Sequence, residues 1–241
     1  MIKIIKLKKG LSVVVPVYNE EKILEKNMKI LDNYLKKLKI SHEIILSENG
    51  STDSSREICR NLYKKNKNFR CIFSNIPSFG ASIRKGSINA KYNKMLVFPV
   101  DLWSLDYIKE ALEKIKGYDS VYGSRYVKKS RQERPLLRVI VSVIHTKLVN
   151  MLLNTRYSDI DGIKMYKTNI GGKILEKTSS NSAFIEVEIG AIIKNSKIKY
   201  AEVSINHKEP KTRHPRYIAK IVLHGIYELF ANYRKLKRLC I

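Results

Sequence analysis

The chain has 241 residues, 44% of them hydrophobic, which is enough for one large globular domain with a sizeable core. Lysine and arginine number 47 against 22 aspartates and glutamates, a formal net charge of +25. This imbalance favours an anionic partner: a nucleotide, a phosphorylated substrate, an anionic lipid headgroup or nucleic acid. Three cysteines without a C-x-x-C pair argue against a disulfide framework or a structural zinc site.

We also expect no signal peptide and no membrane span. The first residues are too few and too charged for a leader, and no run approaches the ~20 apolar residues that a span needs. A soluble or peripheral protein in the reducing cytoplasm is therefore predicted.

Short apolar runs alternate with longer amphipathic patterns along the chain. Strands are predicted at 11–16, 43–46, 70–74, 95–98, 119–123, 163–166 and 199–205. Helices are predicted at 23–38, 53–62, 79–90, 106–115, 136–153 and 185–194. This alternation indicates right-handed βαβ units and an α/β fold with a mainly parallel sheet.

Polar residues stand where several of these strands end. The buried run Met95–Phe98 leads to Asp101, and Ser104 is the predicted N-cap of the next helix, with Asp106 in its first turn. Ligands of open α/β sheets lie outside the carboxyl ends of the strands, so Asp101 is placed to meet a metal, a phosphate or a sugar. The alternative is that Asp101 is only a polar residue at the end of the strand and binds nothing.

Two further loops are ambiguous when taken singly. The loop Glu48–Asp53 offers acids and amides to a nucleobase or ribose, but it would also make an ordinary Asn-Gly turn and helix cap. Gly80 and Gly86 around Arg84 and Lys85 indicate a close backbone approach and a basic rim near phosphates, without the G-K-[ST] of a P-loop.

Taken together, the loops resemble a known pattern. The segments 16–20, 48–53, 80–86, 100–102 and 123–125 occur in the order and spacing of family 2 glycosyltransferases of the GT-A fold. Within that family the chain looks most like the dolichyl- or polyprenyl-phosphate sugar synthases. The resemblance covers roughly residues 11–205 and implies a Rossmann-like GT-A domain over 1–205. The segment 206–241 would follow as a basic loop and a C-terminal amphipathic helix.

The resemblance implies an inverting transfer of a hexose from a nucleotide-diphosphate sugar, of the GDP-mannose or UDP-glucose type, to a polyprenyl or dolichyl phosphate. Asp101 would match the last carboxylate of the family's D-x-D, which binds Mg²⁺ or Mn²⁺ at the donor diphosphate, and would be catalytic. The other residues implied to bind the donor are Pro16, Tyr18, Asn19, Glu20, Glu48, Asn49, Gly50, Asp53, Gly80, Arg84, Lys85, Val100 and Arg213.

A second set of residues is implied to lie beside the acceptor. Arg125 would pair with the acceptor phosphate and take part in catalysis. The other implied acceptor residues are Ser124, Arg131, Asp159, Asp161 and Lys164. The segment Phe184–Glu188 resembles the family's later acidic helix start. A phosphate acceptor is already ionised, so no general base would be needed.

The chain departs from the family pattern at two places. The D-x-D reads Pro99-Val100-Asp101, so its first carboxylate is missing, and the second loop begins Glu48-Asn49. Such a site would bind metal weakly, recruit Asp106 or Glu188, or be inactive. A catalytically silent relative acting as a partner subunit is therefore an alternative to the enzyme.

The apolar segment 136–153 is predicted to lie in a membrane interface, because basic residues precede it and Arg138, His145 and Lys147 lie within it. A plain core helix is the alternative. Together with the basic segment 206–241, an interfacial helix at 136–153 predicts attachment to an anionic membrane at its cytoplasmic face, directly or through a membrane-anchoring protein. A nucleic-acid-binding protein is a further alternative, but the tyrosines do not interleave with a basic stripe, so no specific nucleic acid is expected.

Overall fold

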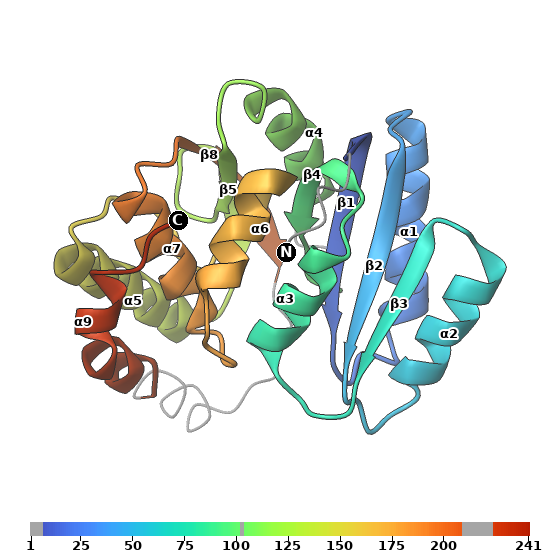
Figure 1. Cartoon of the computed structure of the whole chain (residues 1–241), viewed down its shortest axis with the longest axis horizontal. Helices are drawn as coiled ribbons and strands as arrows, with labels where there is room; N and C mark the ends of the chain where they lie inside the picture. Colours follow the sequence, from blue (N-terminus) through green and yellow to red (C-terminus); the bar gives the residue numbers. More distant parts are fainter. Residues whose placement is uncertain (1–6, 102–103, 209–223) are drawn as a thin grey trace.

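The structure is a computed structural model that describes residues 7–101, 104–208 and 224–241. Within this part of the chain, seven strands form one sheet in the order β3-β2-β1-β4-β7-β5-β8 (Figure 1). Every neighbouring pair is parallel except those of β7, which runs antiparallel to β4 and β5. The strands are β1 (Lys8–Val17), β2 (His42–Asn49), β3 (Phe69–Ser74), β4 (Tyr92–Val97), β5 (Ser120–Ser124), β7 (Lys164–Lys167) and β8 (Tyr200–Ser204). The mainly parallel α/β sheet is thus confirmed.

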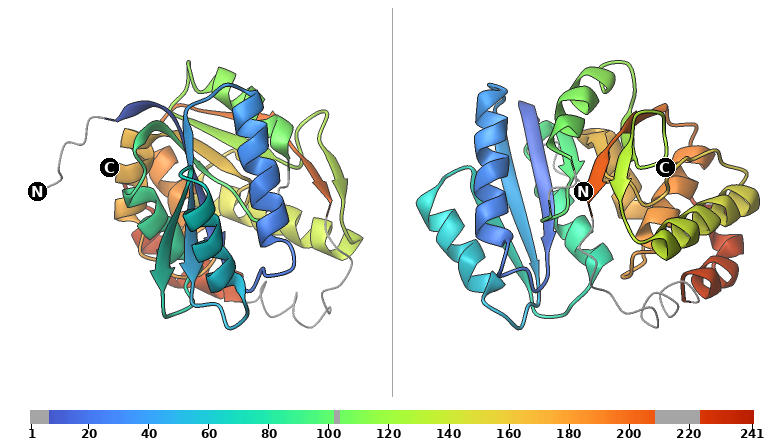
Figure 2. Two further views of the ribbon diagram at one scale, coloured as in Figure 1. Left: turned by 90° about the vertical axis from the view of Figure 1, so that its right-hand side faces the viewer. Right: turned by 180° about the vertical axis from the view of Figure 1, so that it is seen from behind.

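Helices cover both faces of the sheet (Figure 2). The alternation along β1 explains why, since Val13 and Val15 enter one buried cluster and Val14 enters another. The first cluster includes side chains of α1 (Leu24–Lys37), α2 (Ser55–Lys65) and α4 (Leu105–Lys114). The second includes those of α3 (Phe79–Ile88), α5 (Leu136–Leu153), α6 (Thr168–Lys177) and α7 (Ile185–Asn195).

The strand order reverses at β1. The chain passes from β1 outward through β2 to β3 and then returns to β4 on the other side of β1. Pairing between β1 and β4 ends at Val14 and Val97, so their following residues diverge. A topological switch point of this kind opens a crevice at the carboxyl ends of the strands, which is where ligands of such sheets bind.

Close packing of α3 on the sheet explains one of its glycines. A Cβ on Gly86 would stand 2.4 Å from Cγ1 of Val14, so only glycine lets the helix lie this close to β1. The close backbone approach predicted around Gly86 is therefore made to the sheet. α3 is capped by Ser78, whose Oγ accepts a hydrogen bond from the Ala81 amide at 3.2 Å. Ser104 holds the N-cap position of α4 as predicted but makes no side-chain capping hydrogen bond.

Three elements were not predicted. Helix α6 follows β7 directly, and β6 (Arg131–Glu133) pairs in parallel with β9 (Asn206–Lys208) to form a small second sheet. His207 on β9 is buried, although a solvent-exposed loop was expected there.

Helix α5 buries only one face. Ser142, Thr146, Val149 and Leu153 are buried, whereas several large apolar side chains of the same helix are exposed, among them Leu136 at 73%. By length and composition α5 is also apolar enough to cross a membrane, which the sequence analysis did not expect. At the C-terminus, residues 224–231 are helical and α9 (Tyr233–Leu236) follows.

Candidate active site

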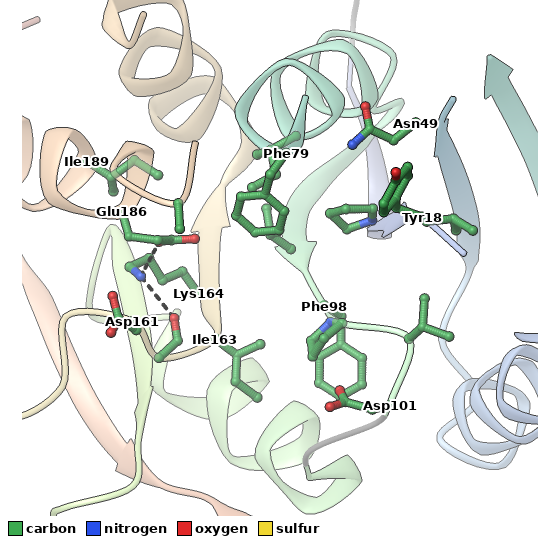
Figure 3. A pocket seen from close by; sticks show the side chains of 18 of the residues that line it. Tyr18, Asn49, Phe79, Phe98, Asp101, Asp161, Ile163, Lys164, Glu186 and Ile189 are labelled. Carbon is green, nitrogen blue, oxygen red and sulfur yellow. Dashed lines mark hydrogen bonds and ion pairs between the residues drawn. The ribbon is translucent and has the colours of Figure 1, made fainter. Parts of the chain in front are cut away.

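A cavity of about 520 Å³ lies at the carboxyl ends of β1 and β4 (Figure 3). Tyr18 and Asn49 lie at one end of it, and Asp161, Lys164 and Glu186 gather at the other. Its lining residues are Pro16, Val17, Tyr18, Glu20, Asn49, Phe79, Ile83, 97–101, 161–164, Tyr166, Ala183, Glu186 and Ile189. Six of the predicted donor-binding residues are in this set: Pro16, Tyr18, Glu20, Asn49, Val100 and Asp101.

The two loops predicted to hold the base and ribose are bonded to each other. The Asn19 side-chain oxygen accepts from the Thr52 amide at 2.9 Å, and Asp53 accepts from the amides of Glu21 at 3.1 Å and Ser55 at 2.9 Å. Neither Asn19 nor Asp53 lines the cavity. Their polar groups satisfy backbone amides, so their role in this structure is to hold the β1 and β2 exit loops together.

In the second loop, Glu48 is held by hydrogen bonds, Gly50 shapes the turn, and Asn49 reaches the cavity. Glu48 is buried and accepts from the Ser51 amide at 2.6 Å and from Nε of Arg56 at 2.8 Å. Gly50 has φ +73°, and a Cβ there would stand 3.2 Å from the Asn75 carbonyl. Asn49 accepts from the Ser78 amide at 2.7 Å and is the residue of this loop that reaches the cavity.

The predicted phosphate rim on α3 points elsewhere. Arg84 donates to the Ser180 carbonyl at 2.6 Å and to the Asn181 side chain at 2.7 Å. A Cβ on Gly80 would stand 2.1 Å from the same Ser180 carbonyl. Lys85 is exposed, and its Nζ lies 3.4 Å from Oγ of Ser74. None of these three residues lines the cavity: Gly80 and Arg84 dock α3 on the segment 179–182, and Lys85 is exposed beside Ser74. Arg213 lies outside the described residues.

Asp101 is the one carboxylate of the D-x-D position, on the wall formed by residues 97–101. Among the described residues, no three acidic, histidine or cysteine side chains gather as metal ligands. Asp106 does not line the cavity, and Glu188 is buried in an ion pair with Lys235. Magnesium sites commonly use one or two carboxylates together with substrate phosphates, so Asp101 fits as one ligand of an ion carried by a bound diphosphate.

Lys164 is enclosed at the other end of the cavity. Its Nζ donates to the carbonyls of Ile160 at 2.8 Å and Gly162 at 2.9 Å and to Glu186 at 2.5 Å. It also lies 4.7 Å from the centre of the Tyr122 ring. Burial raises the pKa of Glu186, and the charge of Lys164 only partly offsets this.

Asp161 faces His145 of α5. Nδ1 of His145 lies 3.7 Å from an Asp161 carboxylate oxygen. Burial favours the neutral form of Asp161, but the nearby His145 outweighs it and lowers the Asp161 pKa to about 2. Burial likewise opposes charging of His145, yet Asp161 raises the His145 pKa above its usual value. Each side chain of the pair thus favours the charged form of the other.

A second cavity of about 550 Å³ adjoins the first and shares Phe79, Asp161, Ala183 and Glu186 with it. Its basic lining residues are Arg134, Arg138, His145 and His224, and Glu228 of the C-terminal segment also lines it, 3.5 Å from Nε2 of His224. The remaining lining residues are Val141, Ser142, Ser182, Phe184 and Gly225. Asp161 and Glu186 thus stand between two cavities of similar size.

The other predicted acceptor residues mostly contact one another. Arg125 donates to Asp159 at 2.6 and 2.7 Å, and the side chains are 5% and 0% exposed. Ser124 is buried and accepts from Oγ of Ser158 at 2.6 Å, while Arg131 is exposed on β6. None of these four lines either cavity, whereas Asp161 lines both and Lys164 lines the first. The geometry gives the Arg125–Asp159 pair a structural role, which differs from the predicted contact between Arg125 and the acceptor phosphate.

Comparison with known proteins identifies the family. The sequence model described as "Glycosyl transferase family 2" matches residues 12–174. The chain belongs to this family. The match covers β1 to the middle of α6 and includes the first cavity except for its α7 wall.

Relatives of this family 2 chain include two that act in glycosylation. The glycosyltransferase AglD of Haloferax volcanii is 24% identical over 209 residues, which are 83% of this chain and 33% of that protein. A dolichyl-phosphate beta-glucosyltransferase of Trichomonas vaginalis is 27% identical over 192 residues, 74% of this chain and 57% of the relative. The matched segments thus span between a third and three fifths of these proteins.

Solved structures share the fold. Glucosyl-3-phosphoglycerate synthase from Mycobacterium tuberculosis, bound to Mn²⁺, uridine diphosphate and glucosyl-3-phosphoglycerate, has a TM-score of 0.66 at 14% identity. The comparison covers 92% of this chain and 79% of the synthase. At this identity the likeness shows the GT-A fold.

Several lining residues of this family 2 domain were not predicted as site residues. Glu186 carried a signal, since it lies in the acidic helix start 184–188. Arg138 and His145 were noted only as charges on an interfacial helix, and Phe79 only as a helix start. His224 and Glu228 follow no motif, because only the folding of the C-terminal segment brings them to the second cavity.

Proposed function

We propose that this chain is an inverting glycosyltransferase that moves a hexose from a nucleotide-diphosphate sugar to a polyprenyl phosphate at a membrane surface. One observation carries the proposal: a cavity at the switch point of the sheet adjoins a second, basic cavity, and Asp161 and Glu186 lie where the two meet. A transferase needs its two substrates side by side, so that the acceptor oxygen can attack the donor carbon in line.

The donor would occupy the first cavity. Tyr18 and Asn49 offer an aromatic face and an amide to the base and ribose, and Asp101 lies where the diphosphate would be carried. The Mn²⁺ and uridine diphosphate bound by the mycobacterial synthase support a divalent cation and a nucleotide donor in this fold. Such an ion neutralises the charge that develops on a diphosphate leaving group. Lys164, held by two carbonyls and Glu186, presents a fixed positive charge at the opposite end.

The acceptor phosphate would occupy the second cavity, where Arg134, Arg138 and His145 supply positive charge. A phosphate oxygen is already ionised and needs no general base. The two carboxylates at the junction agree with this, since Asp161 pairs with His145 and Glu186 with Lys164. The name of the Trichomonas relative, a dolichyl-phosphate glucosyltransferase, supports a prenyl phosphate as acceptor.

The surface near this cavity suits a lipid. On α5, which helps to line it, Leu136, Leu137, Ile140 and Ile144 are exposed, and Tyr227 and Phe230 are exposed on the C-terminal segment. A concentration of exposed apolar side chains on a chain of net charge +25 supports an anionic membrane as partner, and the cytoplasmic face is the location that we propose.

The test is turnover with purified protein, Mn²⁺ or Mg²⁺, a panel of UDP- and GDP-hexoses, and a short polyprenyl phosphate. We expect nucleoside diphosphate and glycolipid from one donor, and loss of nearly all turnover on adding EDTA and in Asp101→Asn. Arg131→Met, at an exposed residue that lines neither cavity, is the control and should retain activity.

Pro99 in the D-x-D position supports a second candidate, a catalytically silent subunit of another synthase. That candidate predicts nucleotide binding by calorimetry without product from any donor, and indifference to Asp101→Asn in the assembled complex.

A further inference from the structure

The C-terminal segment, residues 224–241, lies outside residues 12–174, which the family model matches, and it forms a wall of the second cavity. His224, Gly225 and Glu228 line that cavity, and no described residue of the segment lines the first. In Figure 1 its helices lie beside α5 and α7. The segment therefore bears on the acceptor side of the site alone.

A charge pair anchors the segment to α7. Nζ of Lys235, whose side chain is 42% exposed, lies 2.7 Å from Oε1 of Glu188, which is 1% exposed on α7. The Glu188 carboxylate also accepts from the amides of Ser179 and Ser180, each at 2.9 Å. Burying a carboxylate is costly unless it is paired and hydrogen-bonded, so removing Lys235 takes its ion-pair partner from a buried carboxylate.

Further contacts join the same elements. Nδ2 of Asn195, at the end of α7, donates to the carbonyls of Leu236 at 3.0 Å and Leu239 at 2.9 Å. Leu229 and Leu236 are fully buried in the cluster that contains α7. These contacts set the position of the segment against α7 over its whole length.

A second link leads from the segment to the junction of the cavities. Glu228 accepts from Oγ of Ser182 at 2.9 and 3.1 Å, and the same Oγ accepts from the Phe184 amide at 3.0 Å. Two residues further on, Glu186 lines both cavities and pairs with Lys164 of the first. The position of the C-terminal segment is thus tied to the start of α7, and through it to the wall between donor and acceptor.

We propose that residues 224–241 are a positioning element for the acceptor, with Lys235 acting through Glu188 and Glu228 acting through Ser182. This inference rests on the proposed function for its kinetic consequence. The element fixes the shape of the second cavity and the placing of Glu186, while the end of the first cavity at Tyr18, Asn49 and Asp101, where the nucleoside diphosphate would bind, has no lining residue from the segment.

The test compares Lys235→Met with Lys237→Met. Lys237 lies on the same segment, 4.5 Å from the Tyr233 ring, and serves as the matched control. We expect Lys235→Met to raise the KM for a short polyprenyl phosphate about tenfold and to leave the Kd for the nucleoside diphosphate within twofold. Lys235→Arg, which keeps the charge, should restore the KM. Lys235→Met combined with Glu188→Gln should recover much of it, because glutamine removes the unpaired charge and still accepts from the two serine amides.

Amide hydrogen exchange supplies a readout that needs no turnover. Exchange across 179–188 should quicken in Lys235→Met and not in Lys237→Met. Unchanged exchange, or an acceptor KM equal to that of the wild type, would overturn the positioning role. A parallel rise in nucleotide Kd would also overturn it, since the effect would then be general. Faster exchange in a chain whose wild type makes no product would retain the link to α7 and reject the proposed function instead.

Discussion

Pro99 stands where the family resemblance implies the first carboxylate of the D-x-D, so Asp101 is the carboxylate that this motif offers to the proposed metal ion. We expect Pro99→Asp to lower the Mn²⁺ concentration for half-maximal activity about tenfold, because a second hard oxygen ligand adds to Asp101. Metal titrations of turnover at fixed donor measure this. Pro99→Asn is the control, since it removes the proline without adding charge. An equal change in both variants would assign the effect to the backbone.

His145 gives the acceptor cavity a charge that depends on pH. Asp161 raises the His145 pKa above its usual value, so the imidazolium is present below that raised pKa and is lost as pH rises through it. A phosphate monoester is already a dianion above about pH 7, and the arginines of the cavity stay charged. The KM for the acceptor should therefore rise as pH rises through the His145 pKa.

The control for this prediction replaces each histidine of the cavity in turn. His145→Gln should raise the KM at neutral pH and flatten its rise with pH, whereas His224→Gln should preserve the rise. If the KM for the acceptor still rises with pH in His145→Gln, the titrating group is not His145.

At the scale of elements, the Arg125–Asp159 pair joins the end of β5 to the segment that follows α5. Both side chains are buried, so Asp159→Asn leaves a buried guanidinium without its counter-charge. We expect a loss of about 3–5 kcal/mol in the free energy of unfolding, as breaking a buried pair does. Urea denaturation measures it, with exposed Arg131→Met expected to change stability by less than about 0.5 kcal/mol.

Substitution of Arg125 itself separates its two possible roles. If Arg125 binds the acceptor phosphate as the family resemblance implies, Arg125→Met should weaken acceptor binding with little loss of stability. If the buried pair with Asp159 is structural, Arg125→Met should instead lower stability strongly and have little direct effect on acceptor binding.

Element types were readable from the sequence wherever periodicity was clear. Leu11–Pro16 and the segment 95–98 are strand-forming apolar runs, and α1 and α5 have the apolar spacing of helices. Helix α6 was missed because its Gly171 and Gly172 lower helix propensity. The structure gives a reason for Gly171, since a Cβ there would stand 2.7 Å from Met95. Tertiary packing overrides propensity at this position.

The sequence predicted which loops form the site, but not which of their side chains face the cavity. Strand exits placed Asp101 and Asn49 at the cavity, because the topology of the sheet brings these exits together. Which polar groups face outward depends on hydrogen bonds between loops. Asp53 accepts from the Glu21 amide, and Arg84 donates to the Ser180 carbonyl, through contacts between distant segments that no local pattern encodes.

For the whole molecule, net charge and exposed apolar surface point to the same partner. Many acidic side chains are engaged in ion pairs, so the excess of lysine and arginine is left for the surroundings. Each basic group near an anionic membrane contributes about 1 kcal/mol, and this attraction weakens with salt. The exposed side of α5 adds apolar area, with Ile140 and Ile144 at 45% and 55% exposure.

We therefore expect the chain to sediment with vesicles that contain anionic phospholipid, and much less with neutral vesicles. Binding should weaken as salt rises. Ile140→Ser with Ile144→Ser should weaken it about tenfold, since burying such side chains stabilises by about 1.5–3 kcal/mol each when complete and these are half exposed. Ile88→Ser on α3, 77% exposed and away from both cavities, is the matched control. If Ile88→Ser weakens binding equally, or random oligonucleotides bind more tightly than anionic vesicles, the charge serves another surface or a nucleic acid, and α5 is a core helix with an exposed side.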